Sequence, residues 1–252
     1  MNLKTKEEIQ IMREGGKILK DVLDQLQTAV TPGLQTKELD KLARELISSN
    51  GAEPSFLNYN GFPAALCVSI NEEIVHGLPS SRVLKDGDLL KLDLGVFYKG
   101  FHTDSARSLV VCPSATGSSK YKKKLELINV AEEALQRGIE AAQLGCRLGD
   151  IGHAIQGCVE AHGFNVIRDL VGHGIGREVH EEPEVLNYGE PDTGAKLVEG
   201  MVIAIEPLVV EGKWQITDGS DGFAYVTKDG KLAAHAEHTV AISKDGPIVL
   251  TT

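Results

Sequence analysis

The feature that most constrains the fold of this chain is a weak internal repeat between its two halves. Each half opens with helix-like apolar periodicity and continues with strand-like apolar runs. Residues around the second helix of each half recur at a constant spacing of 112 residues: Gly33, Leu39 and Gly51 match Gly145, Ile151 and Gly163. Such a repeat predicts one supersecondary unit used twice, and chance similarity between amphipathic helices is the alternative.

The first long strand of each half repeats as well. The run GDLLKLD, which ends at Asp93, parallels GMVIAIE, which ends at Glu206, with a spacing of 113 residues. If the halves pack about a pseudo-two-fold axis, these two acids face each other across it. No Pro-, Gly- or Ser-rich linker separates the halves. We therefore expect a single domain over residues 1–252, with half-repeats of approximately 1–115 and 120–252.

Apolar periodicity also predicts the individual elements. One helical stripe runs from Ile9 to Leu26, and a second follows Thr36 as its N-cap and ends near Gly51. Further helices are expected over residues 121–143 and from 148 to about 163. Strands are expected over residues 65–70, 88–98, 101–112, 166–171, 201–210, 223–227 and 237–242. The order predicts a mixed α/β protein.

Several of these strands carry residues that are costly to bury. Four acids and one imidazole lie in or beside apolar stretches: Asp93, Asp104, His173, Glu206 and Glu237. A carboxylate at a buried strand position is unfavourable unless it is paired or binds a metal. For single members of the set, the alternatives are an acid exposed at a strand end and a histidine satisfied within a loop.

Asp93 and Asp104 flank a predicted hairpin turn at Lys99-Gly100. A two-residue loop would place Asp93 opposite Ala106 and Asp104 on the same face of the hairpin. Two carboxylates that close repel each other at low dielectric, and a divalent cation is the simplest remedy. An oxygen-rich set with one imidazole suits Mn, Fe(II), Co or Zn. Two ions about 3.5–4 Å apart would use all five ligands and would activate water.

Composition excludes other functions. A net charge of −10 argues against a protein that binds nucleic acid, which would normally show a basic face. The four cysteines form no CxxC pair and do not predict a thiolate zinc site. No apolar stretch reaches the length of a membrane span, and the charged N-terminus has no signal-peptide core. We expect a cytoplasmic protein.

Several motifs together resemble a type I methionine aminopeptidase of the bacterial kind. They are NEEIVHGLP with His76, KDGD before Asp93, GFHTD with Asp104, GHGIGREVHEEP with His173 and His180, IEP with Glu206 and EHT with Glu237. The resemblance covers essentially the whole chain. It implies the pita-bread fold, in which two pseudo-symmetric halves surround an antiparallel sheet with helices on the outside. It also implies removal of the initiator methionine when the second residue is small.

The resemblance further implies roles for individual residues. Asp93 would bind one of two divalent ions (Co, Mn, Fe, Zn or Ni), Asp104 and Glu237 would bridge them, and His173 and Glu206 would complete the second site. His76, His180 and Glu206 would be catalytic, with both histidines at the scissile amide. Tyr59, Phe62, Cys67 and Phe223 match the segments of the methionine pocket, with ordinary core as their alternative. Phe223 stands where tryptophan is common, and Ala236 where an aromatic residue is common.

The resemblance also implies partners and leaves two competing functions. The substrate would be the N-terminal methionine of nascent polypeptides, with possible proximity to the ribosome, and the protein would be a monomer. An Xaa-Pro aminopeptidase or creatinase-like hydrolase would keep the fold but usually carries an additional N-terminal domain. A non-enzymatic binding module would typically have lost metal ligands, whereas all five are present here.

Overall fold

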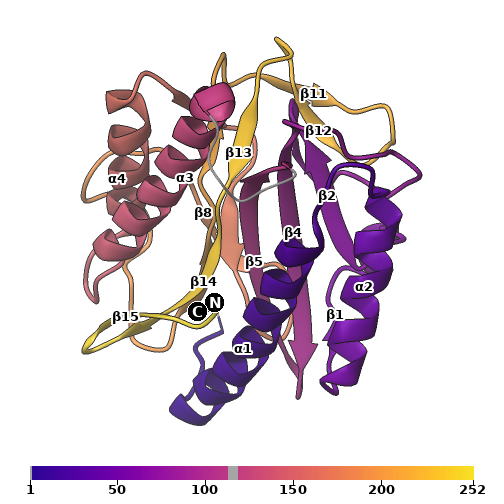
Figure 1. The fold of residues 1–252 in the computed structure, drawn as a ribbon. Coiled ribbons are helices and arrows are strands. Elements are labelled where there is room, and N and C mark those ends of the chain that lie inside the picture. Colours follow the sequence, from indigo (N-terminus) through magenta and orange to yellow (C-terminus); the bar gives the residue numbers. More distant parts are fainter. Residues whose placement is uncertain (1, 113–118) are drawn as a thin grey trace.

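The computed structural model describes residues 2–112 and 119–252. In the view of Figure 1, α1 crosses in front of the strands, α2 lies to its right, and α3 and α4 lie together at the left. The helices span Lys6–Ala29 (α1), Thr36–Ser49 (α2), Lys122–Ala141 (α3) and Leu148–Ala161 (α4), with short 3₁₀ turns at Tyr59–Gly61 and Ser119–Tyr121.

The strands of the first half form a sheet around one long hairpin. In this sheet β4 lies between β1 and β2, and β5 also pairs with β4. The small strand β3 belongs to a separate sheet with β11 and β12 of the second half. The bounds are Glu53–Pro54 (β1), Leu66–Ile70 (β2), Glu73–Val75 (β3), Leu89–Tyr98 (β4) and Phe101–Val110 (β5).

The strands of the second half form an antiparallel sheet in the order β15-β14-β9-β7-β8 and a smaller one in the order β13-β10-β6. Their bounds are Asn165–Val166 (β6), Gly172–Gly174 (β7), Glu181–Val185 (β8), Val202–Ile205 (β9), Leu208–Val210 (β10), Ile216–Asp218 (β11), Tyr225–Thr227 (β12), Ala233–His235 (β13), His238–Ser243 (β14) and Gly246–Val249 (β15).

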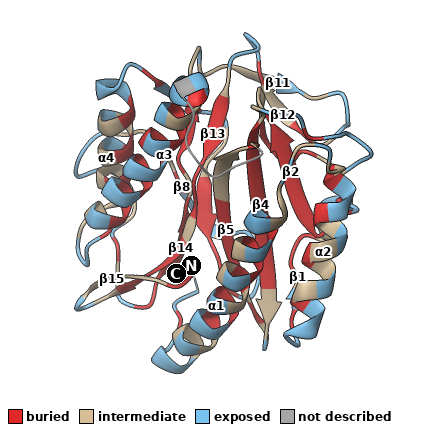
Figure 2. Cartoon of the chain, in the orientation of Figure 1, coloured by how far each residue is buried: buried red, intermediate tan, exposed pale blue. Residues whose placement is uncertain are grey.

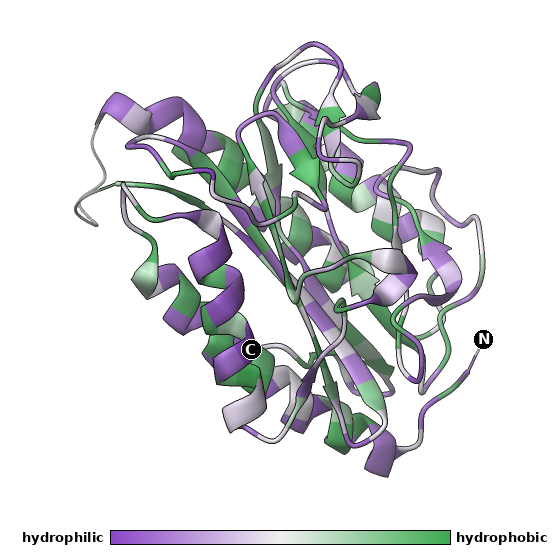
Figure 3. Cartoon of the chain, turned by 90° about the vertical axis from the view of Figure 1, so that its right-hand side faces the viewer, coloured by the Kyte–Doolittle hydropathy of each residue, from purple (hydrophilic) through white to green (hydrophobic). Residues whose placement is uncertain are grey.

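Each half buries its own apolar cluster between helices and strands. In the first half, Leu19, Leu39 and Leu92 belong to one cluster, built from α1, α2 and β4. In the second half, Ile155 of α4 and Ile203 of β9 belong to another. The strands are largely buried, and the helices present buried residues inward and exposed ones outward (Figure 2). Hydrophobic and hydrophilic residues accordingly alternate along the helices (Figure 3).

The second helix of each half agrees with the repeat seen in the sequence. Helices α2 and α4 are both 14 residues long, and their bounds differ by the spacing seen in the sequence. Both begin the same way: Glu38 accepts the Gln35 N–H at 2.9 Å, and Asp150 accepts the Arg147 N–H at 2.7 Å. These carboxylates satisfy N–H groups that a helix start leaves unpaired.

Three predicted details were wrong: one helix N-cap and the extents of two strands. Thr36 is the first residue of α2 and not its N-cap, because its hydroxyl bonds instead with the backbone of Ser80. The expected strand over residues 166–171 is restricted to Asn165–Val166. The Arg168 guanidinium, inside the expected strand, lies over the ring of Trp214, 5.6 Å from its centroid. Arg168 therefore lies in a loop and packs against Trp214.

The expected strand over residues 201–210 is divided into β9 and β10 at Glu206-Pro207. Proline has no N–H with which to continue a strand ladder. The Glu206 carbonyl accepts a hydrogen bond from the Asn187 side chain at 3.0 Å.

Candidate active site

The β4–β5 hairpin positions two acids on one face. Asp93 pairs with Ala106, and Asp104 pairs with Gly95. The turn residues Lys99 and Gly100 both have positive φ, 48° and 90°, as a two-residue type I′ turn requires. Because Asp104 and Ala106 are two residues apart on β5, their side chains share a face with Asp93. The predicted hairpin geometry is confirmed.

The second half supplies the other three predicted residues, which lie in or next to strands. His173 lies in β7, Glu206 follows β9 and Glu237 precedes β14. Strands β9 and β14 pair with His238 opposite Ile205, so Glu206 and Glu237 are the next positions along this ladder. The register therefore brings these two acids together.

Hydrogen bonds join the two halves at β5 and β14. The Asp104 N–H donates to the Thr239 hydroxyl at 2.9 Å, and that hydroxyl donates to the Asp104 carbonyl at 2.8 Å. The Glu237 N–H donates to the Ala106 carbonyl at 3.1 Å. As a result, ligand atoms of Asp104, His173 and Glu237 lie within 4.8 Å of one another.

The acids are buried and incompletely hydrogen-bonded. Asp93 is 8% exposed, Asp104 4% and Glu237 2%, and each has one carboxylate oxygen without a hydrogen-bond partner among the described residues. Burial raises the pKa of all three and of Glu206, and repulsion from Asp93 raises the pKa of Asp104, Glu206 and Glu237 further. Ionising all four acids in this small volume is therefore unfavourable unless a cation lies among them.

His173 has a free lone pair that can bind a metal ion. Its Nδ1 lies 2.9 Å from the Gly174 carbonyl, which requires an N–H at Nδ1 and leaves the lone pair on Nε2. Nε2 lies 3.8 Å from a Glu206 oxygen. Burial lowers the pKa of His173 to about 3, so the ring is neutral at physiological pH. The donor set consists of a neutral imidazole and unpaired carboxylate oxygens. Such a set fits hard or borderline divalent cations.

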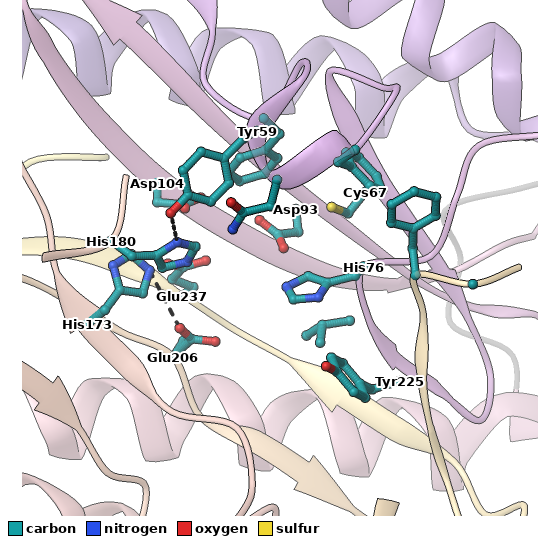
Figure 4. A pocket seen from close by; sticks show the side chains of 16 residues that line it. Tyr59, Cys67, His76, Asp93, Asp104, His173, His180, Glu206, Tyr225 and Glu237 are labelled. Carbon is teal, nitrogen blue, oxygen red and sulfur yellow. Dashed lines mark hydrogen bonds and ion pairs between the residues drawn. The ribbon is translucent and has the colours of Figure 1, made fainter. Parts of the chain in front are cut away.

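These side chains line one cavity of about 410 Å³, and the residues predicted for the methionine pocket line it too (Figure 4). The Phe62 and Phe223 rings meet edge to face with centroids 5.4 Å apart. Burial raises the pKa of the Cys67 thiol well above its usual range, so this wall carries no charge there. Ala236 is buried in the core of the second half and is not among the lining residues.

The two predicted catalytic histidines also reach this cavity. His76 follows β3 and has φ +59°, a left-handed conformation that is uncommon outside glycine and is frequent at functional sites. Burial lowers the pKa of the His76 ring to about 4. His180 has its Nδ1 2.8 Å from the Tyr59 hydroxyl, and its ring centroid lies 4.2 Å from that of His173.

Sequence reasoning missed several residues of the site. Phe56, Asn60, Val75, Gly222 and Tyr225 also line the cavity. Most come from loops or short strands whose pairing the sequence does not specify. His235 was missed as well, although it lies two residues before Glu237 and a strand alternates with period two. Its Nε2 is 3.8 Å from Glu237 and 3.6 Å from Glu206.

Among the described residues, no helix is long and apolar enough to cross a membrane. The family profile "Metallopeptidase family M24" matches residues 10–244. The chain is 50% identical to a methionine aminopeptidase of Clostridium perfringens, covering 99% of this chain and 98% of that protein. It is 47% identical to methionine aminopeptidase 1 of Bacillus subtilis, covering 98% of each.

A solved methionine aminopeptidase from Thermotoga maritima has the same fold, with a TM-score of 0.94 and 41% identity over 100% of this chain and 99% of that one. The predicted pita-bread architecture, with two pseudo-symmetric halves and outer helices, is confirmed by this likeness. The profile, the identities and the structural likeness each extend over most or all of the chain. The chain belongs to metallopeptidase family M24.

Proposed function

We propose that this protein is a methionine aminopeptidase that removes the initiator methionine from new proteins when the second residue is small. The observation that carries this proposal is the cavity itself. It combines buried carboxylates and an imidazole at one wall with two aromatic rings and a thiol at another. The names of relatives with 50% and 47% identity over nearly the whole chain support the choice of substrate.

Within this proposal, two divalent metal ions are held by Asp93, Asp104, His173, Glu206 and Glu237. The unpaired oxygens of Asp93, Asp104 and Glu237 and the free Nε2 of His173 support this assignment. When bound, such ions lower the pKa of water and polarise the carbonyl that is attacked. The metal in the cell is one of Co, Mn, Fe, Zn and Ni, and the carboxylate-rich set admits each of them.

His180 and His76 act on the scissile peptide. The Tyr59 hydroxyl lies 2.8 Å from Nδ1 of His180. In this proposal the phenol donates to Nδ1, which places the ring proton on Nε2 and makes that nitrogen a donor toward the substrate carbonyl. His76 is neutral at physiological pH because its pKa is lowered to about 4 by burial, so it can donate to or accept from the scissile amide without adding charge. Glu206 accepts a proton from the attacking water and passes it to the leaving amine.

The methionine side chain occupies the wall formed by Tyr59, Phe62, Cys67 and Phe223. A thioether makes favourable contacts with aromatic ring edges, and the perpendicular rings of Phe62 and Phe223 offer both an edge and a face. Phenylalanine at position 223 is smaller than the tryptophan expected there, and Ala236 adds no aromatic surface. The pocket therefore owes its shape mainly to the loop residues 56–62 and to Phe223.

The protein also acts, in this proposal, as a single-domain monomer in the cytoplasm and close to the ribosome, where nascent chains first expose their methionine. The half-repeats of about 1–115 and 120–252 form that domain jointly, since the cluster draws Asp93 and Asp104 from the first and the other three residues from the second.

The test is peptide hydrolysis by purified, folded protein supplied in turn with Mn, Co, Fe, Zn and Ni. The proposal predicts release of methionine from Met-Gly-Met and from Met-Ala peptides. Failure to release methionine with every metal would overturn it. Preferential cleavage of an Xaa-Pro dipeptide would favour the Xaa-Pro aminopeptidase reading, and a protein that binds no metal would favour a binding module.

A further inference from the structure

His235 is a buried imidazole for which the reaction proposed above has no use. It is the last residue of β13, is 1% exposed and does not line the cavity. Neither Nδ1 nor Nε2 has a hydrogen-bond partner among the described residues. Buried polar groups are nearly always hydrogen-bonded, so an imidazole with both nitrogens unpaired requires an explanation.

The ring lies against the outer side of two acids of the cluster. Nε2 is 3.6 Å from Oε2 of Glu206 and 3.8 Å from Oε2 of Glu237. The other oxygen of Glu206, Oε1, lies 3.8 Å from His173 Nε2. Glu206 is therefore placed between two imidazoles, of which His173 lines the cavity and His235 does not.

The backbone holds His235 in this place. The Ser108 hydroxyl accepts the His235 N–H at 2.9 Å and donates to the His235 carbonyl at 2.7 Å. Strand pairing adds a second constraint, because His235 is opposite Leu208 in the β10–β13 ladder. His235 and Glu237 are two residues apart, which places both side chains on the same side of an extended chain.

We propose that His235 is a positioning residue of the metal centre, whose Nε2–H donates to the outer oxygens of Glu206 and Glu237. These hydrogen bonds would hold both carboxylates so that their other oxygens face the metal, a role that residues behind metal ligands commonly have. The inference rests on the proposed function. Hydrogen bonds of about 2.7–3.2 Å require the acids and the ring to approach by roughly half an ångström to one ångström when the site is loaded.

The first test compares Mn(II) affinity in three variants stripped of metal with a chelator. His235→Met keeps volume but cannot donate, whereas His235→Gln keeps an N–H donor. His238→Gln is the matched control, since its half-buried ring lies on β14 and bonds with the Thr251 hydroxyl at 2.8 Å. We expect the affinity to fall roughly 10–100-fold in His235→Met, to recover most of that loss in His235→Gln, and to be unchanged in His238→Gln.

Wild-type affinity in His235→Met would overturn the inference while leaving the proposed function intact. A wild-type protein that binds no Mn(II) would instead overturn the proposed function. If His235→Met does not fold, long-range ¹H–¹⁵N spectra of the zinc-loaded wild-type protein decide the question. The inference predicts a proton on Nε2 of His235, and an Nε2 that binds zinc or carries no proton would refute it.

Discussion

Removing one charge from the acid cluster should stabilise the metal-free protein and weaken its response to metal. Asp93→Asn is the cleanest change, because asparagine preserves the shape of the side chain. Asp93 is 8% exposed, and one of its oxygens has no hydrogen-bond partner among the described residues. Burial is the main cause that raises the pKa of this carboxyl from 3.8 to about 7.

The size and sign of the effect follow from linkage. A rise from 3.8 to about 7 corresponds to about 4 kcal/mol as an upper limit, at about 1.36 kcal/mol per pKa unit. Because the pKa is higher in the folded state, the metal-free wild type loses stability through Asp93 as the pH rises from about 4 to about 7. Below about pH 4 the carboxyl is protonated in both states and contributes no difference.

Urea unfolding in the presence of a chelator measures the effect. At pH 8 we expect metal-free Asp93→Asn to be more stable than wild type by up to about 4 kcal/mol, with the advantage shrinking toward pH 4. Saturating Mn(II) should stabilise the wild type more than the variant, since ligand binding adds to folding free energy. The exposed Asp245→Asn is the control and should change neither quantity. An Asp93→Asn protein no more stable than wild type at pH 8 would refute the reasoning.

Three further predictions concern the cavity. His180→Ala should lower methionine release at least about 100-fold while metal content by elemental analysis stays near wild type; loss of metal would make His180 a ligand. Tyr59→Phe removes the 2.8 Å contact with His180 Nδ1 and should lower kcat/KM about tenfold without altering metal affinity, so steady-state kinetics that match wild type would contradict the assigned tautomer. Phe223→Ala removes the edge-to-face contact with Phe62 and should raise KM for Met-Gly-Met several-fold, and an unchanged KM would place methionine elsewhere.

The sequence predicted the elements that local patterns determine. Apolar periodicity located the helices, and the spacing between Asp93 and Asp104 fixed their shared face because a two-residue hairpin leaves only one register. The repeat predicted matching second helices, which the structure has at the expected spacing. All the ligands, catalytic histidines and pocket residues that the motifs predicted line one cavity.

Residues whose position depends on distant contacts were not predicted. The local sequence predicts Thr36 as an N-cap, but its hydroxyl forms hydrogen bonds with the backbone of Ser80 instead. Arg168 lies in an apolar run but contacts Trp214. No sequence pattern distinguishes His235, because its contact with Glu206 depends on where β13 packs. Tyr225 reaches the cavity only because β12 pairs with β3.

In the proposed site, five side chains from the two halves hold divalent ions at one end of the cavity. Crystals of the manganese-loaded protein, with diffraction recorded on both sides of the Mn absorption edge, test it most directly. The account predicts two anomalous peaks within about 2.0–2.4 Å of oxygens of Asp93, Asp104, Glu206 and Glu237, one of them also near His173 Nε2. Anomalous peaks only at other sites, or none at saturating manganese, would contradict it.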